Sequence, residues 1–258
     1  MLRVRKSSFV SVIPAAMLAV AVLGPTTGIA QEYMIPSGTP ANIRNAVGSD
    51  ARPAEDRARD AGRKPAEVLT LAGLESGDHV IELGSFGNYY TRILLGAVGS
   101  SGQVDMIDVP RSEPFGGEGS RALAAASDNA TYTLRDYEAG AFPQGADLVF
   151  LVLHYHDLQP WGVDMAVLNR AVFDALSPGG RFVVIDHKAE DGSGWRDAES
   201  VHRIGAQVIV EEVTAAGFEL SVDSDLLANA DDDRSGPIFA PGSRGATDRA
   251  LLVFTKPE

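Results

Sequence analysis

The sequence predicts an α/β fold with a doubly wound, mostly parallel sheet of seven strands, of which the last is antiparallel. From residue 79 onward, apolar runs of strand length alternate with segments of helical periodicity, an order typical of parallel sheets. Residues 147–153 form an almost continuous apolar run, which indicates a central strand buried on both faces. Residues 250–255 follow the sixth strand, 218–222, without an intervening helix, so we expect these two strands to form an antiparallel hairpin.

The first 30 residues have the pattern of a secretory signal peptide. Three basic residues, Arg3, Arg5 and Lys6, precede an apolar stretch at 9–23, and the small residues Gly28 and Ala30 follow. The apolar stretch is shorter than the roughly 20 residues that a membrane-spanning helix needs. We therefore predict cleavage after Ala30 and an exported protein, periplasmic or secreted, with no membrane segment left after cleavage.

The chain is acidic, with a formal net charge of −13. Residues 1–30 carry three basic and no acidic side chains, so the exported part has a charge of −13 − 3 = −16. This charge argues against nucleic acid or an anionic membrane as a partner, and we expect a small-molecule substrate instead. Cysteine is absent, so no disulfide can form. No feature of the sequence indicates an oligomeric state.

Residues 31–52 are rich in proline, glycine, serine and asparagine, and we predict an extended leader there, with the folded domain at 53–258. Residues 53–74 predict two helices with a break near 62–65. Charged side chains crowd residues 55–60, and we expect a solvated helix face with ion pairs between neighbouring turns. The alternative is that this first helix covers a ligand pocket.

Residues 78–108 form the most informative stretch of the chain. A strand at 79–83 leads into a turn with two glycines at 84–87, and a helix at 89–98 starts after Asn88. A second strand at 103–107 ends at Asp108. This order is that of a nucleotide-binding βαβ unit, in which the turn and the helix N-terminus present N–H groups to an anion. Asp108 lies where an acid accepts hydrogen bonds from ribose hydroxyls.

The rest of the domain follows the same alternation. We expect helices at 120–126, 164–176 and 199–216, and strands at 131–135 and 181–185. Because parallel strands end at one edge of the sheet, the polar residues at 136, 154–157 and 186–188 should converge there. The connection at 223–249 leaves from the same edge, and long loops of this kind are often lids.

Glu82, Gly84 and Gly87 form an E-x-G-x-x-G pattern that resembles motif I of class I S-adenosylmethionine-dependent methyltransferases. LSPGGRFVVID at 176–186 is similar to the family's entry into its fifth strand, and the antiparallel last strand is a family hallmark. The resemblance covers residues 53–258, is closest to a branch of secreted bacterial proteins called predicted methyltransferases, and implies a Rossmann-like methyltransferase fold. The chain departs from the family pattern E/D-x-G-x-G-x-G at Phe86 and Asn88. The Phe86 ring would keep a cofactor from its usual depth unless it turns toward the protein.

The resemblance implies S-adenosyl-L-methionine as the cofactor and methyl transfer to an unknown, small acceptor as the reaction. Asp108 would accept hydrogen bonds from the ribose, and Asp136 would meet the adenine amino group. Glu82 and the backbone at 84–87 would hold the methionine part of the cofactor. The full set of expected cofactor-binding residues is Glu82, Gly84, Ser85, Gly87, Asn88, Asp108 and Asp136. Without a cofactor role, Asp108 would cap a loop and Asp136 would be a turn residue.

The residues after the fourth strand would face the methyl acceptor, as they do in the family. A general base is needed only if the acceptor must lose a proton during transfer. His156 is the first candidate for that base and His187 the second, and Asp157 lies beside His156 in the sequence.

Two other function classes stay open. Histidines and aspartates at 154, 156, 157, 186 and 187 are competent ligands for a divalent metal, but their spacing matches no strong metal motif. We expect these side chains to form a hydrogen-bonded network rather than a metal site. The other class is a ligand-binding protein without catalysis, which the altered glycine turn and the predicted export both favour.

Overall fold

The computed structural model describes residues 33–138, 142–243 and 245–258. The predicted signal peptide at 1–30 lies outside the described residues, so its cleavage site stays a prediction. Within the described part of the chain, no helix is long and apolar enough to cross a lipid bilayer.

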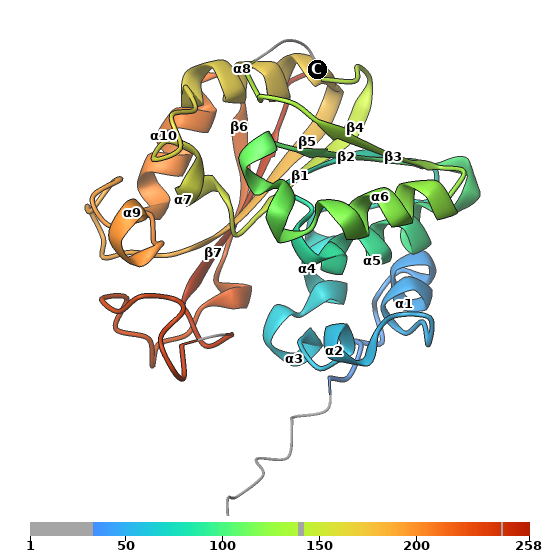
Figure 1. Ribbon diagram of the computed structural model, residues 1–258, viewed down its shortest axis with the longest axis horizontal. Helices are drawn as coiled ribbons and strands as arrows, with labels where there is room; N and C mark the ends of the chain where they lie inside the picture. The colour runs from blue at the N-terminus through green and yellow to red at the C-terminus, as the bar shows by residue number, and fades with distance from the viewer. Residues whose placement is uncertain (1–32, 139–141, 244) are drawn as a thin grey trace, which may run out of the picture. The chain divides into compact units, whose positions relative to one another are not determined.

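Seven strands form one sheet in the order β3-β2-β1-β4-β5-β7-β6 (Figure 1). Strands β1 to β5 pair in parallel, and β7 pairs antiparallel with both β5 and β6. The predicted α/β fold with an antiparallel last strand is therefore confirmed. The strands are β1 (His79–Leu83), β2 (Gln103–Asp108), β3 (Ala130–Leu134), β4 (Ala146–Val152), β5 (Leu176–His187), β6 (Glu219–Ser224) and β7 (Arg249–Thr255).

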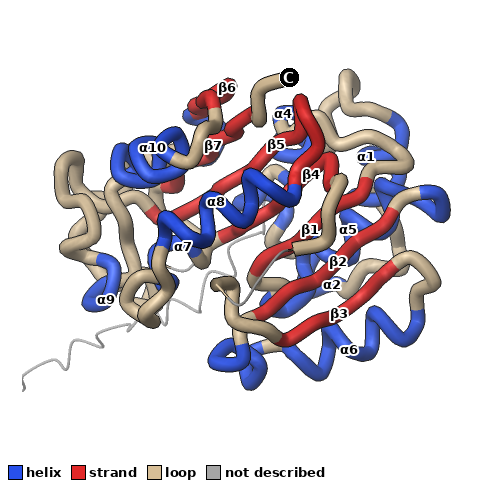
Figure 2. Tube along the Cα trace, turned by 90° about the horizontal axis from the view of Figure 1, so that it is seen from above, coloured by secondary structure: helices blue, strands red, loops and turns tan. Residues whose placement is uncertain are grey.

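Helices cover both faces of the sheet (Figure 2). One face carries α7 (Tyr155–Leu158), α8 (Met165–Ala175) and α10 (Ala206–Ala215), and the other carries α1 (Ala41–Val47), α4 (Pro65–Leu71) and α5 (Tyr89–Val98). Helix α6 (Gly117–Ala126) packs along the edge strand β3. The remaining short helices are α2 (Ala54–Arg57), α3 (Asp60–Arg63), α9 (Ala198–Val201), η1 (Phe86–Asn88), η2 (Gly99–Ser101), η3 (Pro110–Phe115) and η4 (Asp225–Leu227).

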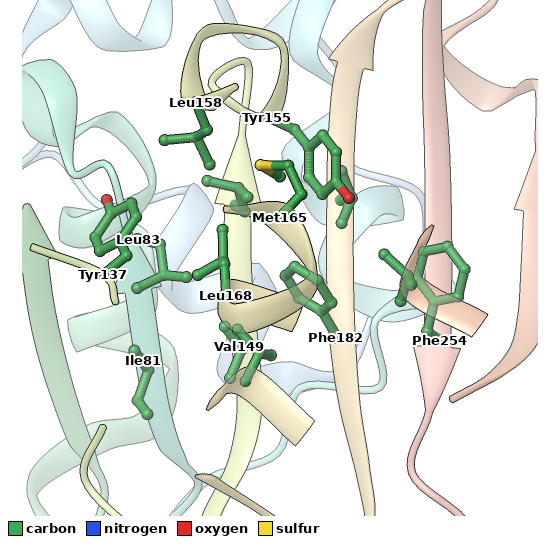
Figure 3. Close-up of a cluster of buried hydrophobic side chains, with 14 of the residues drawn as sticks. Ile81, Leu83, Tyr137, Val149, Tyr155, Leu158, Met165, Leu168, Phe182 and Phe254 are labelled. Carbon is green, nitrogen blue, oxygen red and sulfur yellow. The ribbon is translucent and has the colours of Figure 1, made fainter. Parts of the chain in front are cut away.

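Side chains along the central strands alternate between two apolar layers. Ile81 and Leu83 of β1 lie in the layer drawn in Figure 3, together with Leu168 of α8. Val80 of the same strand faces the opposite layer, which contains Ile93 of α5. This period of two follows from strand geometry, because successive side chains point to opposite faces. The central strands are thus buried on both faces, as the apolar run at 147–153 predicts.

The predicted extended leader at 31–52 is wrong for residues 41–47, which form α1. Ile43, Ala46 and Val47 are buried against α4 and α5, and their spacing of three and four residues places them on one side of a helix. A Cβ on Gly96 of α5 would lie 3.1 Å from the Ala46 Cβ, so glycine permits the close approach of the two helices. The folded unit therefore begins before residue 53.

The charged residues at 55–60 do not form a uniformly solvated face. Asp56 and Asp60 are 2% and 4% exposed. Arg52, also buried, donates to both carboxylate oxygens of Asp60 at 2.8 and 2.7 Å, and the Tyr89 hydroxyl donates to the same carboxylate at 2.5 Å. Arg92 of α5 donates to Asp56 at 2.8 Å. These acids are buried because guanidinium groups satisfy their charge, so the expectation of a solvated face is wrong for them.

One feature of the C-terminal half differs from the expectations, and the expected lid stays a prediction. The predicted helix at 199–216 is two helices, α9 and α10, because His202 between them takes a left-handed conformation with φ of 58°. The connection between β6 and β7, the expected lid, is tied down by ion pairs. Arg203 is buried and pairs with Asp232 at 2.8 Å, while Arg234 pairs with Asp248 at 2.8 Å.

Candidate active site

The switch point of the sheet lies between β1 and β4. From there, β2 and β3 extend the sheet to one side, and β5, β7 and β6 extend it to the other. In open α/β sheets, ligands bind in the crevice beyond the carboxyl ends of the strands at such a point. The glycine turn after β1 and the polar residues after β4 therefore meet at the expected place.

The turn after β1 depends on its glycines. Gly84 and Gly87 have φ values of 76° and 67°, in the left-handed region that glycine adopts without a steric cost. A Cβ on Gly84 would lie 2.8 Å from Cδ2 of His154, so glycine also lets that ring rest on the turn. Asn88 closes the turn by donating from Nδ2 to the Ser85 carbonyl at 3.0 Å and to Ser120 Oγ at 2.8 Å.

Asp108, the expected ribose acceptor, is bound to the turn itself. Its side chain is fully buried and accepts from the Ser85 backbone N–H at 2.8 Å. The Ser85 hydroxyl lies 3.2 Å from both carboxylate oxygens. Burial raises the pKa of Asp108, and the Ser85 N–H opposes that rise because it favours the charged form. In this conformation Asp108 caps the loop, the second of the two roles that the sequence left open.

Glu82, the acid before the turn, is buried against α5. It is 5% exposed and accepts a hydrogen bond from the Thr91 hydroxyl at 2.6 Å. Burial raises its pKa to about 8, and the charge of Asp108 adds to the rise. Glu82 therefore holds a proton up to neutral pH and stabilises the junction of β1 and α5 as a neutral group.

Aromatic rings lie over the glycine turn. The Phe86 ring packs edge-on against His154, with centroids 4.6 Å apart, and Trp161 packs on the same imidazole at 5.0 Å. The Phe86 ring thus lies over Gly84 beside His154, so a cofactor would reach the turn only if the ring moved. His154 is fully buried, and its Nε2 has no hydrogen-bond partner among the described residues.

The backbone conformation of Leu153 places His154 over the glycine turn. Its φ of 55° is unusual for a bulky side chain, and its N–H donates to the Ile185 carbonyl at 2.7 Å. Backbone strain of this kind persists where surrounding contacts enforce it and is frequent at functional sites. The chain therefore bends sharply out of β4 and places the next imidazole over the turn.

Histidines and aspartates after β4 and β5 form one cluster. His156 is buried, with Nδ1 2.7 Å from Asp186 Oδ1 and Nε2 3.3 Å from Asp157 Oδ1. His202 places Nδ1 3.0 Å from the same Asp157 oxygen, and His154 Nδ1 lies 3.2 Å from Asp157 Oδ2. Burial lowers the pKa of His156, but the two carboxylates outweigh it and raise the pKa to about 10. Burial acts against ionisation of Asp157, but the imidazoles hold the pKa of that carboxyl well below its usual range.

Of the two other predicted site residues, His187 borders this cluster and Asp136 lies apart from it. His187 is buried with Nδ1 2.8 Å from the Thr247 hydroxyl, and burial lowers its pKa to about 3. It stays neutral at physiological pH, and its ring centroid is 5.9 Å from that of His156. Asp136 follows β3 and is exposed. The structure thus brings Glu82, Ser85 and Asp108 together, with the histidine cluster across the switch point.

Two histidines of the site were not predicted as catalytic residues. His154 was expected only among the residues that face the acceptor and among the possible metal ligands, since nothing in the sequence distinguishes it from His156. His202 lies 45 residues from Asp157 and joins the cluster through the left-handed end of α9. Helices α7 and α9 lie side by side in both views (Figures 1 and 2).

No protein-family model matches the chain, and no curated protein matches it by sequence. Its fold is similar to many solved structures. One is an S-adenosylmethionine-dependent methyltransferase from Mesorhizobium loti, at 19% identity and a TM-score of 0.56, covering 77% of this chain and 100% of that one. Another is a SAM-dependent methyltransferase from Aquifex aeolicus, at 17% identity and a TM-score of 0.54, covering 73% and 87%.

The [4+2]-cyclase SpnF, an enzyme of a different reaction, has a similar fold. It is 16% identical, with a TM-score of 0.54, and the match covers 83% of this chain and 91% of that one. At these identities the similarity shows that the chain shares the fold of class I methyltransferases. The reaction has to be argued from the site, because one fold hosts several chemistries.

Proposed function

We propose that this protein is an exported S-adenosylmethionine-dependent methyltransferase that acts on a small acceptor. The observation that carries the proposal is the buried His154 imidazole, which rests on Gly84 with Nε2 free of any hydrogen-bond partner among the described residues. A buried polar atom without a partner is costly and calls for a functional explanation. The shared fold with the methyltransferases from Mesorhizobium loti and Aquifex aeolicus supports the same class.

The residues at the switch point fit the cofactor in kind. The N–H groups of the turn would suit the methionine part and Asp108 the ribose hydroxyls, whereas Glu82 is held by Thr91 as a neutral group in the present conformation. The Asp108 carboxylate accepts from Ser85 in the present conformation, so it would have to exchange these hydrogen bonds for bonds from the ribose. We therefore expect weak binding, with a Kd of tens to hundreds of micromolar, or about −5 to −6 kcal/mol.

His154 replaces His156 as our candidate for the general base. When bound, the cofactor supplies an electrophilic methyl group. Once the Phe86 and Trp161 rings moved away from it, His154 Nε2 would take a proton from the acceptor, and Asp157 Oδ2, 3.2 Å from Nδ1, would orient the ring and stabilise its charged form. His156 is less suited to this role because both of its ring nitrogens face carboxylates. Positioning of the acceptor over the turn would provide the rest of the catalysis.

Calorimetry with S-adenosylhomocysteine tests the cofactor step. Binding should weaken by about 1–3 kcal/mol in Asp108→Ala, the range for loss of a hydrogen bond to a buried polar partner. Asp50→Ala, which changes an exposed aspartate, is the matched control and should bind as the wild type does. Absence of heat at millimolar ligand, with circular dichroism showing a folded protein, would refute the proposal.

Transfer of a labelled methyl group to a panel of small hydroxyl and amine acceptors tests the base. We expect His154→Gln to lower kcat by about 10²- to 10⁴-fold, with S-adenosylhomocysteine affinity retained. His79→Gln is the matched control, because His79 is also paired with an aspartate, Asp105 at 2.7 Å, but at the other end of β1. An unchanged rate in His154→Gln would remove His154 from the reaction.

A second candidate function is ligand binding without catalysis. The observation in its favour is the closed contact between Ser85 and Asp108, which occupies the ribose acceptor. Stoichiometric binding of S-adenosylhomocysteine together with no methyl transfer to any acceptor would select this function. Transfer to one acceptor would exclude it.

Export is a separate part of the proposal and rests on residues 1–30. Mass spectrometry of the protein recovered outside the cytoplasm should show Gln31 as the first residue. A full-length N-terminus would refute the predicted cleavage.

A further inference from the structure

We propose that His156, Asp157 and His202 bind a divalent transition metal ion. One ligand atom from each lies within 4.8 Å of the other two. This inference reverses the expectation drawn from the sequence. That expectation rested on the lack of a known ligand spacing and did not include His202, which the fold brings from the end of α9 to His156 and Asp157 of α7. The inference is independent of methyl transfer, because it concerns only what these three side chains bind.

The spacing of the three ligand atoms suits a metal. Zinc binds nitrogen and oxygen ligands at about 2.0–2.2 Å, so two ligands at a tetrahedral angle lie roughly 3.3–3.6 Å apart. His156 Nε2 is 3.3 Å from Asp157 Oδ1, within this range, and His202 Nδ1 is 3.0 Å from the same oxygen, slightly below it. Two imidazoles from different segments therefore approach one carboxylate oxygen, as they would around a shared ion.

Surrounding contacts hold each ligand in place. Asp186 is buried and lies 2.7 Å from His156 Nδ1, which leaves His156 Nε2 directed at Asp157, where a metal ion would replace the proton on that nitrogen. A carboxylate behind a ligating histidine fixes its tautomer and raises its basicity, and it is a regular companion of metal sites. Asp157 is anchored from the other side, since its Oδ2 lies 3.2 Å from His154 Nδ1.

His202 adopts its position at a conformational cost. Its φ of 58° and ψ of 48° are left-handed, and this backbone ends α9 and directs the ring at Asp157. Phe239, 73% exposed, packs edge-on against the ring at 5.1 Å. The His202 side chain is 35% exposed, whereas the His156 side chain is 2% exposed. The cluster is thus closed behind His156 and open to solvent beside His202.

This arrangement predicts the type of metal. Two histidines and one carboxylate with an open side form the ligand set of catalytic zinc and of non-haem iron(II), and the remaining positions are taken by water or substrate. The set lacks the many oxygen ligands that calcium and magnesium prefer. We therefore expect Zn²⁺ to bind and Co²⁺ to report the geometry by its absorption spectrum.

Zinc titration of the exported chain, prepared without a histidine tag and stripped with a chelator, tests the inference. We expect one Zn²⁺ per chain by calorimetry and a rise in Tm on loading. His202→Ala and Asp157→Asn, which each remove a ligand, should bind Zn²⁺ at least about 100-fold more weakly, and Asp186→Asn about 10- to 100-fold more weakly. His79→Ala should bind as the wild type does, because His79 pairs with Asp105 outside the cluster.

Circular dichroism of each variant shows whether it is folded, and the half-exposed His202 offers the substitution that disturbs packing least. Failure of the folded wild type to bind Zn²⁺, or equal affinity in the wild type, His202→Ala and Asp157→Asn, would overturn the metal site. S-adenosylhomocysteine binding on the same samples separates this result from the proposed function. Zinc binding without cofactor binding would leave the metal site standing and remove the methyltransferase proposal.

Discussion

Replacing Glu82 with glutamine should remove this side chain's contribution to the pH dependence of stability between about pH 5 and pH 8. The pKa of Glu82 is raised from 4.5 to about 8, with burial as the main cause. The folded protein therefore binds a proton more tightly than the unfolded chain does. Between these two pKa values, the folded state keeps its proton while the unfolded state loses it.

The sign and size of the effect follow from this difference. The stabilising contribution of the protonated side chain is complete below pH 4.5 and falls as the pH rises toward 8. The fall is about 1.4 kcal/mol per pH unit for one group, so it totals a few kcal/mol across the window. Glutamine cannot ionise, so Glu82→Gln should show a constant offset from hydrogen-bond changes at Thr91 and no contribution from this titration.

Urea unfolding followed by circular dichroism at a series of pH values measures this effect. The informative quantity is the difference in unfolding free energy between wild type and Glu82→Gln, because all other titrating groups cancel. This difference should shift in favour of the variant as the pH rises toward 8. Glu219→Gln, which changes an exposed glutamate at the start of β6, should track the wild type. A difference between Glu82→Gln and wild type that is independent of pH would refute the account of Glu82 as a buried, neutral acid.

Three further predictions concern packing and the crevice. Gly102→Ala should destabilise the protein by about 1–3 kcal/mol in urea unfolding, because its Cβ would lie 2.6 Å from a backbone oxygen, whereas Gly38→Ala meets no atom within 4 Å and should be neutral. Arg52→Met should cost about 3–5 kcal/mol in thermal or urea unfolding, since it leaves the buried Asp60 carboxylate without its guanidinium, and a cost under 1 kcal/mol would contradict the buried pair. Phe86→Gly should leave S-adenosylhomocysteine affinity unchanged or raise it in calorimetry, because the ring lies over the glycine turn, and a tenfold loss would show that the ring itself contacts the ligand.

The βαβ unit could be predicted from the sequence because its signals are local. The helix at 89–98 begins and ends as predicted, since Asn88 and Gly99 take left-handed φ values at its two ends. Helix α1 could also have been found, because Ile43, Ala46 and Val47 have helical spacing, but the surrounding Pro, Gly, Ser and Asn residues concealed it.

The candidate site was predicted in outline and missed in detail, because its contacts join distant segments. The carboxyl ends of β1 and β4 meet as the parallel sheet requires. Ser85 and Asp108 are 23 residues apart in the sequence, and no local pattern indicates the hydrogen bonds between them. In the same way, the burial of Asp60 depends on Arg52 and Tyr89 together, and sequence patterns do not distinguish a charge that finds a buried partner from one that stays in water.

The shared carboxylate of Asp157 constrains how this protein can diverge. Its Oδ2 faces His154 above the glycine turn, while its Oδ1 faces His156 and His202. Loss of this one side chain would therefore disturb both the imidazole over the turn and the histidine pair beside it. A single substitution of Asp157 therefore cannot remove the contact with His154 and keep the contacts with His156 and His202, or the reverse. Among descendants of this fold, Asp157 and its three histidines should be kept, or lost, as a set.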